Sequence, residues 1–152
     1  MTTRDLRRRR RRGATIVETA LVISTCLLLV FGIYEYGRFL MVRNLMDNAV
    51  QVGARYAVVH TYDATTADIQ NRVDQLLAGQ SVHLPGYNKT TSIQVYWADA
   101  TGNNLGAWTD APFGQYIAIR LDGTYRPMLP NFLFMNSSFT VRAHAQMYSE
   151  AN

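Results

Sequence analysis

Hydrophobic residues at the start of this chain form one long block with no regular polar stripe. From Ala14 to Tyr34 the sequence is apolar except for Glu18 and a few hydroxyl side chains. At about 1.5 Å of rise per helical residue, this stretch is long enough to cross a hydrocarbon core of about 30 Å. A soluble core helix of that length would show a polar stripe. The pattern therefore predicts a membrane-spanning helix.

After this block the apolar positions recur at a three-four spacing, which is typical of an amphipathic helix. The stripe comprises Phe39, Val42, Met46, Ala49, Gly53 and Tyr56, and it is widened by Met41, Leu45, Val52 and Val59. We expect one helix from about Ala14 to about Val59, with its second half docked on an external domain. Gly53 costs a helix about 1 kcal/mol relative to alanine, so we expect a strand to cross closely there.

A second, shorter helix is predicted after a turn near Thr61. Thr65 and Asp68 form a capping-box-like start, and Gly79 is a suitable C-terminal cap. Its buried stripe is expected to consist of Ile69, Val73, Leu76 and Leu77.

From Ser92 onward the period changes to two, which indicates half-buried strands. Three such stretches begin near Ile93, Ile117 and Phe139. The predicted fold is α+β: a long N-terminal transmembrane helix extends into a small external domain. In that domain a second helix packs on an antiparallel sheet of three or four strands, and the other face of the sheet is solvated.

Charge divides the chain unevenly. The whole sequence is formally +4, but seven arginines and one aspartate lie in the first 13 residues, which are thus +6 while the remainder is −2. A basic run directly before a span is a topology signal that keeps the N-terminus cytoplasmic. Arginine runs also occur in nucleic-acid-binding proteins, but the adjacent span makes topology the simpler interpretation, and we expect no nucleic-acid partner.

These patterns predict four segments. Residues 1–13 are a basic cytoplasmic leader, 14–35 the transmembrane helix, 36–60 its external continuation and 61–152 a small α+β domain. The protein is thus expected in the inner (plasma) membrane as a single-pass protein, in contact with membrane lipid, with its C-terminal domain periplasmic or extracellular.

Glu18 is the one acidic residue inside the apolar block. A carboxylate among lipid tails costs about 2.5 to 3.5 kcal/mol, so it usually has a partner or a function. One interpretation is that Glu18 lies near the headgroups, where the helix dipole favours an acid. The other begins with Gly13, the glycine between the arginine run and the helix. Cleavage after Gly13 would give Ala14 a free ammonium group and make Glu18 the fifth residue. The ammonium group and the carboxylate would then form a complementary pair, either within one chain or between neighbouring chains.

Three motifs in the first 60 residues resemble the TadE-like minor pseudopilins of tight-adherence (Tad/Flp) pilus systems, whose leader is similar to that of type IV pilin-like proteins. The motifs are RGATIVE at residues 12–18, FGIYEYGR at 31–38 and AVQVGARYA at 49–57. The resemblance implies a subunit processed between Gly13 and Ala14, with Glu18 acting in assembly, and possible incorporation in the pilus. It also implies four kinds of partner: a prepilin peptidase, a major pilin, other minor pseudopilins and an inner-membrane assembly platform driven by a cytoplasmic ATPase.

Two alternatives have their own sequence features. A permanently anchored periplasmic binding or scaffolding domain would use the arginines for topology alone. A lipoprotein would be modified at Cys26, the single cysteine, but the apolar run continues past that residue.

The connection from Asp99 to Gly114 is longer than an ordinary hairpin loop and is rich in Gly, Asn, Asp and Pro. Loops of this kind are either functional or mobile, and we consider Trp108 and Phe113 as a possible contact with another subunit. Asp99, Thr101, Asn103 and Asp110 fall at calcium-loop spacings, but the glycine is misplaced, so we expect no metal.

A second connection, residues 125–130, holds two prolines that forbid regular strand pairing. The apolar residues 132–135 after it are expected to form a short strand or to lie under the sheet, or else to offer a patch to a partner.

Catalytic motifs are not found in the sequence. His60, His83 and His144 lie far apart in unrelated contexts, and neither zinc-spaced cysteines nor a nucleotide-binding glycine loop occurs. We therefore expect no enzyme activity, no cofactor and no small-molecule substrate.

Overall fold

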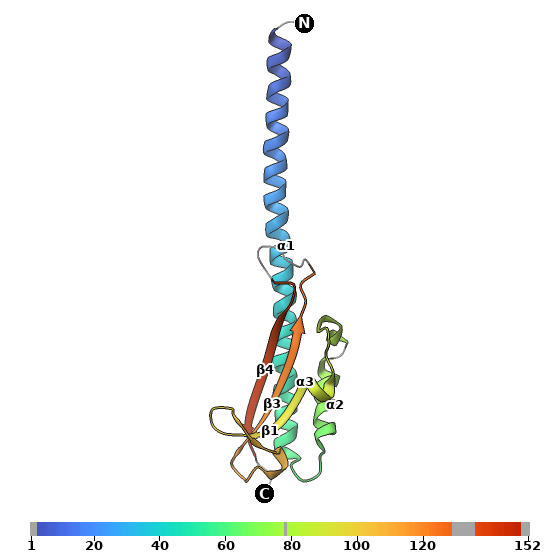
Figure 1. Ribbon diagram of the computed structural model, residues 1–152, viewed down its shortest axis with the longest axis vertical. Coiled ribbons are helices and arrows are strands. Elements are labelled where there is room, and N and C mark those ends of the chain that lie inside the picture. Colours follow the sequence, from blue (N-terminus) through green and yellow to red (C-terminus); the bar gives the residue numbers. More distant parts are fainter. Residues whose placement is uncertain (1–2, 78, 129–135, 150–152) are drawn as a thin grey trace. The chain divides into compact units, whose positions relative to one another are not determined.

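The computed structural model describes the backbone of residues 3–77, 79–128 and 136–149, and the side chains in these ranges from Thr15 onward. The chain divides into two units, residues 1–38 and residues 39–152 (Figure 1). The helices are α1 (Thr3–Val59), α2 (Thr66–Leu77) and α3 (Lys89–Ser92), with short 3-10 helices η1 (Gln80–His83) and η2 (Trp108–Asp110). The strands are β1 (Ile93–Ala98), β2 (Asn104–Gly106), β3 (Tyr116–Tyr125) and β4 (Phe139–Tyr148).

The first unit consists of the N-terminal part of α1. This helix begins at Thr3, earlier than the start at Ala14 that the sequence predicted. Arginine is a good helix former, and no proline separates the arginine run from the apolar block, so the helix continues through both. Thr19 and Thr25 donate their hydroxyls to the carbonyls of Thr15 and Leu21, at 2.8 and 2.9 Å, which satisfies these polar groups within the helix.

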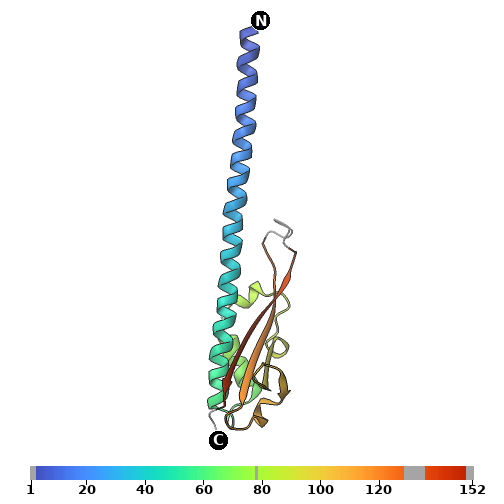
Figure 2. The same ribbon diagram turned by 90° about the vertical axis from the view of Figure 1, so that its left-hand side faces the viewer.

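The second unit is an α+β domain with an antiparallel sheet in the order β2-β1-β3-β4. The three strands that the sequence predicted are confirmed as β1, β3 and β4. β3 and β4 pair over ten residues, from Tyr116 opposite Tyr148 to Tyr125 opposite Phe139, without a register shift. The part of α1 from Phe39 onward follows one face of the sheet (Figure 2).

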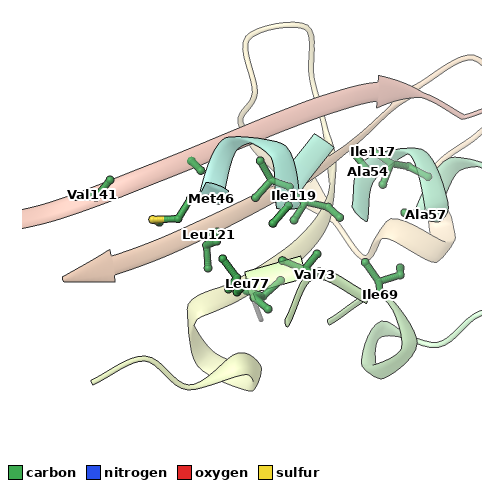
Figure 3. Packing of buried hydrophobic residues seen from close by; sticks show 14 of the residues in the cluster. Met46, Ala54, Ala57, Ile69, Val73, Leu77, Ile117, Ile119, Leu121 and Val141 are labelled. Carbon is green, nitrogen blue, oxygen red and sulfur yellow. The ribbon is translucent and has the colours of Figure 1, made fainter. Parts of the chain in front are cut away.

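The core lies between this face and the two longer helices (Figure 3). α1 contributes its small and flexible side chains, α2 a row of branched ones, and β3 three consecutive inward residues. The labelled members are Met46, Ala54, Ala57, Ile69, Val73, Leu77, Ile117, Ile119, Leu121 and Val141. Of the predicted α1 stripe, Met41 and Val59 are instead about half exposed. The covered face of α1 is therefore narrower than the predicted stripe.

At Gly53, α1 lies close to side chains of α2 and β3. A Cβ atom at this position would lie 2.4 Å from Cγ2 of Val73 and 3.1 Å from Cδ1 of Ile119. The sequence predicted a crossing strand here, but the nearest atom belongs to α2. The glycine therefore makes room for a valine side chain of the second helix.

The start of α2 is a reciprocal capping box, as predicted. The Thr65 backbone N–H donates to Oδ2 of Asp68 at 2.9 Å, and the Asp68 N–H donates to the Thr65 hydroxyl at 3.3 Å. The pKa of Asp68 is lowered by the hydrogen bonds that it accepts from Thr65. Gly79, just beyond α2, has φ +78°, a left-handed conformation that suits glycine.

Aromatic side chains gather where the chain enters the second unit. The ring of Phe39 lies 5.5 Å from that of Tyr125 and 5.4 Å from that of Phe139, in edge-to-face contacts. Tyr125 and Phe139 are also in contact, at 5.2 Å. The end of β3 and the start of β4 are thereby fixed to the first residue of α1 in this unit.

The outer face of the sheet is not wholly solvated, in contrast to the prediction. Tyr96, Ala98 and Ala118 point outward yet are buried, with Tyr116 packed against them. The loop after β1 folds back over them, and the Tyr96 hydroxyl donates to the Gly102 carbonyl at 3.3 Å. β3 ends at Tyr125, two residues before Pro127. Pro130 and the apolar residues 132–135 lie outside the described residues.

Candidate functional site

The apolar part of α1 in the first unit presents its side chains outward. Ile16, Leu21, Ile33 and Tyr34 are each exposed by 60% or more. Of the described residues, one helix is long and apolar enough to cross a membrane, judged by length and composition. Water is a poor solvent for such a surface, whereas lipid is a good one. The helix is therefore a candidate membrane span.

The predicted processing site lies within α1. The backbone of Gly13 and Ala14 is helical, and Glu18, one turn further on, is exposed. Residues four apart lie on the same face of a helix, separated by about 6 Å along its axis. The geometry thus puts Glu18 on the same side as the first residue that would remain after cleavage.

An ion pair at the end of the first unit was missed at the level of sequence. Arg38 donates from Nη2 to Oε1 of Glu35 at 3.1 Å, and the two side chains are only 12% and 5% exposed. Two charges removed from water stabilise each other when they are paired in this way. The signal was present, because Glu35 and Arg38 stand three apart in the FGIYEYGR motif, a spacing at which helical side chains meet.

The two aromatic residues of the long connection between β1 and β3 differ in their exposure to solvent. Trp108 is 2% exposed, and its indole N–H donates to the Thr66 hydroxyl at 2.9 Å. Phe113 is 66% exposed. Trp108 is thus a core residue that ties the loop to the start of α2, and any subunit contact of this loop through an exposed aromatic side chain falls to Phe113.

The first part of this connection is organised by Asp99. Its carboxylate accepts hydrogen bonds from the backbone N–H groups of Thr101 and Asn103, at 2.8 and 2.9 Å, and from both of their side chains. These bonds lower the pKa of Asp99, that from the Thr101 hydroxyl most strongly. The aspartate therefore uses its carboxylate oxygens to shape a turn. No cluster of three or more metal-ligating residues occurs among the described side chains.

A charged cluster occupies the open part of the outer sheet face. Asp122 accepts from Nε of Arg142 at 2.7 Å and lies 3.1 Å from Nε of Arg120. The hydrogen bond to Asp122 raises the pKa of Arg142, while burial and the charge of Arg120 lower the pKa of His144. This arrangement is an ion-pair network on adjacent strands, and its exposed members are available for contacts with other molecules.

The three histidines are not brought together. His60 follows α1, His83 ends η1 and His144 lies in β4. His60 stacks on Tyr56 with ring centroids 4.2 Å apart.

Taken together, the fold and these sites define a class of proteins in which a helix of membrane-spanning length leads into a small α+β domain. The chain also matches a known family in sequence: residues 13–55 match the family described as TadE-like protein. This confirms the resemblance to the TadE-like family over these residues. No curated protein and no solved structure matches the chain.

Proposed function

We propose that this protein is a minor pilin-like subunit, or pseudopilin, for assembly of a tight-adherence (Flp-type) pilus. In this proposal it is made as a precursor in the inner membrane, with its N-terminus cytoplasmic, and a prepilin peptidase cuts it after Gly13. One observation carries the proposal: the match to the TadE-like family begins at Gly13 and extends over the apolar helix. The arginine run thus lies outside the matched segment, as a removable leader would.

Cleavage would create the charge that Glu18 requires. The new ammonium group of Ala14 would lie at a helix N-terminus, where the helix dipole adds a further partial positive charge. In a lipid environment an unpaired carboxylate is costly and a paired one is not. Because Glu18 is exposed on α1, it is available to the ammonium group of a neighbouring copy. Such a pair would fix the axial position of one helix against the next.

The bond to be cut lies inside a continuous helix, so a peptidase must first unwind it locally. Gly13 lowers the cost of this step, because glycine in a helix interior is less favourable than alanine by about 1 kcal/mol. A glycine at this position would therefore ease local unwinding of the helix as well as mark the site for the peptidase.

The partners of this function are a prepilin peptidase, a major pilin, other minor pseudopilins, the inner-membrane assembly platform and membrane lipid. The proposed role is structural. It involves no catalysis, no cofactor, no nucleic acid and no small-molecule substrate.

Intact-mass measurement of the membrane-bound and pilus-associated protein, with N-terminal sequencing, tests the processing step. The expected mature chain begins at Ala14 and lacks the mass of residues 1–13. A working protein that retains the arginine run would refute the proposal.

A Glu18→Gln variant tests the pairing step. The amide keeps the shape of the side chain but removes the charge, so we expect normal cleavage with loss of assembly. Because about 1.4 kcal/mol corresponds to a factor of ten, loss of one pair in lipid should lower incorporation into sheared pili by about tenfold or more. Asp47→Asn is the matched control, since Asp47 forms only a 3.9 Å surface pair with Arg43. Equal incorporation of Glu18→Gln and Asp47→Asn would show that the pair does not act in assembly.

The continuity of α1 through residues 13 and 14 favours a second candidate, a permanently anchored periplasmic binding or scaffolding domain. An uncleaved helix would hold the domain at the membrane, with the arginines setting its topology. The intact mass separates this candidate from the first. The lipoprotein alternative is decided by lipid labelling of wild type against Cys26→Ala; Cys26 is exposed on α1, and the helix continues well beyond it.

A further inference from the structure

Two strand edges of the second unit remain without a neighbouring strand among the described residues. The sheet order places β4 at one edge and β2 at the other. β4 is ten residues long and pairs with β3 in continuous register. β2 is three residues long, and all of them are exposed. Its register with β1 shifts between Trp97 and Ala98, so Leu105, which is 51% exposed, has no directly opposed residue on β1.

The β4 edge lacks several of the features that block strand pairing. Every second residue of an edge strand points its N–H and C=O outward, and proteins commonly block such edges with prolines, lysines, bulges or a covering element. β4 has no proline and no lysine, and its pairing with β3 shows no bulge. It is therefore a long template for a further strand.

The directions of α1 and of the strands limit which strand of another copy can pair with β4. We consider copies whose second units are related by a shift, so that the part of α1 in this unit runs the same way in each copy. A two-fold axis perpendicular to β4 would pair two β4 strands antiparallel, but it would also reverse α1 in one copy. A two-fold axis along β4 would keep the direction of α1, but it would set each outward N–H opposite the same N–H of the other copy.

One edge-to-edge arrangement meets both requirements. β1 is antiparallel to β2 and to β3, and β3 is antiparallel to β4. β4 and β2 therefore run in opposite directions. The β4 edge of one copy and the β2 edge of the next can pair antiparallel while every α1 keeps its direction.

We propose that β4 of one copy pairs in this way with Asn104–Gly106 of a neighbouring copy, so that the sheet continues from subunit to subunit. The inference rests on the proposed function, because it takes copies to stand side by side in one membrane. The contact is head-to-tail, and such contacts form rings or open-ended helical assemblies. It also brings the exposed Leu105 next to β4 of the neighbouring copy.

The sheet itself predicts the register. Asn104 lies opposite Ala98, Ala98 opposite Tyr116, and Tyr116 opposite Tyr148. For two copies whose second units have no axial offset, this row continues from Tyr148 into Asn104 of the neighbouring copy. An axial offset between copies moves the contact along β4 by one residue for about every 3.4 Å.

Cysteine cross-linking of the full-length protein in membranes tests the contact. In a Cys26→Ala background, Asn104→Cys is combined in the same chain with Tyr148→Cys, Gln146→Cys, His144→Cys or Arg142→Cys, all at outer-face positions of β4. Directly opposed side chains have Cβ atoms about 4.5 to 5.5 Å apart, which suits a disulfide. We expect one pair, or two adjacent pairs, to give an oxidation-dependent ladder of three or more copies. The position that reacts reports the axial offset.

Two sets of controls accompany the pairs. Asn104→Cys with Thr124→Cys, which lies on the interior strand β3, should give no ladder, and single-cysteine chains should stay monomeric. Leu105→Lys should reduce the ladder by about fivefold or more, whereas Leu105→Ile should retain it, because a charge disfavours strand pairing at an edge.

The outcomes separate this inference from the proposed function. If the intact mass shows leader removal and pili form, but every pair stays monomeric, the edge contact is wrong and the proposed function stands. Dimers that do not extend to longer ladders, or dimers of the single His144→Cys chain, also overturn it. A retained leader refutes the proposed function, whatever the cross-links show.

Discussion

Gly53→Ala offers a direct test of how α1 packs in the second unit. The added Cβ would lie 2.4 Å from Cγ2 of Val73 and 3.1 Å from Cδ1 of Ile119, and both of these residues are fully buried. Valine has few χ1 alternatives, so relief requires α1 and α2 to move apart.

Two effects of opposite sign compete in this variant. Replacing a helical glycine by alanine contributes about 1 kcal/mol of stability, whereas overpacking a filled core costs about 1 to 3 kcal/mol. A contact as short as 2.4 Å lies at the severe end, so we expect a net loss of about 1 to 2 kcal/mol. For a domain of this size that corresponds to a fall in Tm of roughly 4 to 8 °C.

Thermal unfolding of the full-length protein in detergent micelles measures this loss. Trp97 and Trp108 both lie in the second unit, so tryptophan fluorescence reports its unfolding. Gly37→Ala is the matched control in the same helix, because a Cβ at residue 37 would meet nothing within 4 Å. It should leave Tm unchanged or slightly raised.

A double variant tests whether the clash with Val73 causes the loss of stability. Val73→Ala removes the clashing methyl group, so Gly53→Ala should cost at least about 1 kcal/mol less in that background than in wild type. If Gly53→Ala is as stable as wild type, or if the two losses simply add, the proposed packing of α1 against α2 is incorrect.

Two further predictions concern the connection between β1 and β3. Trp108→Phe should keep most of the buried surface but lose the bond to Thr66, lowering the free energy of unfolding by about 0.5 to 1.5 kcal/mol; in a Thr66→Val background the same change should cost clearly less, and an equal cost in both would argue against the bond. Asp99 is expected to make stability pH-dependent. Its pKa lies below the ordinary value of 3.8, so its contribution is present above about pH 4 and is lost as the pH falls through the lower folded value. Tm of wild type should therefore decrease more steeply than Tm of Asp99→Asn between about pH 4 and pH 2, and parallel curves would contradict the role of this carboxylate.

Helices and strands whose hydrophobic residues recur at a regular spacing could be predicted from the sequence. The three-four spacing of Val42, Met46 and Ala49 indicated the buried side of α1, and the alternation after Ile117 and Phe139 indicated β3 and β4. The capping box at Thr65 was also recognisable, because it depends on neighbouring residues alone. Local periodicity was sufficient wherever one face of an element is covered.

Features that depend on the packing of distant segments were not predictable. Trp108 resembled an exposed loop aromatic, yet its partner Thr66 stands 42 residues away. Tyr96 alternates as an outward residue, and it is buried because a loop returns over it. The outer edges of β4 and β2 depend on the strand order, which periodicity does not specify. α1 begins at Thr3 and not at Ala14, because the change from arginines to apolar residues does not interrupt a helix.

The aromatic cluster of Phe39, Tyr125 and Phe139 has a consequence for synthesis. Phe39 leaves the ribosome long before Phe139, and the two rings meet only when the last strand has been made. Until then the apolar side of α1 beyond the span lacks its complete cover, and β3 presents an open edge. A chain that stops before residue 139 would stay in that state, with β3 as an unprotected edge strand.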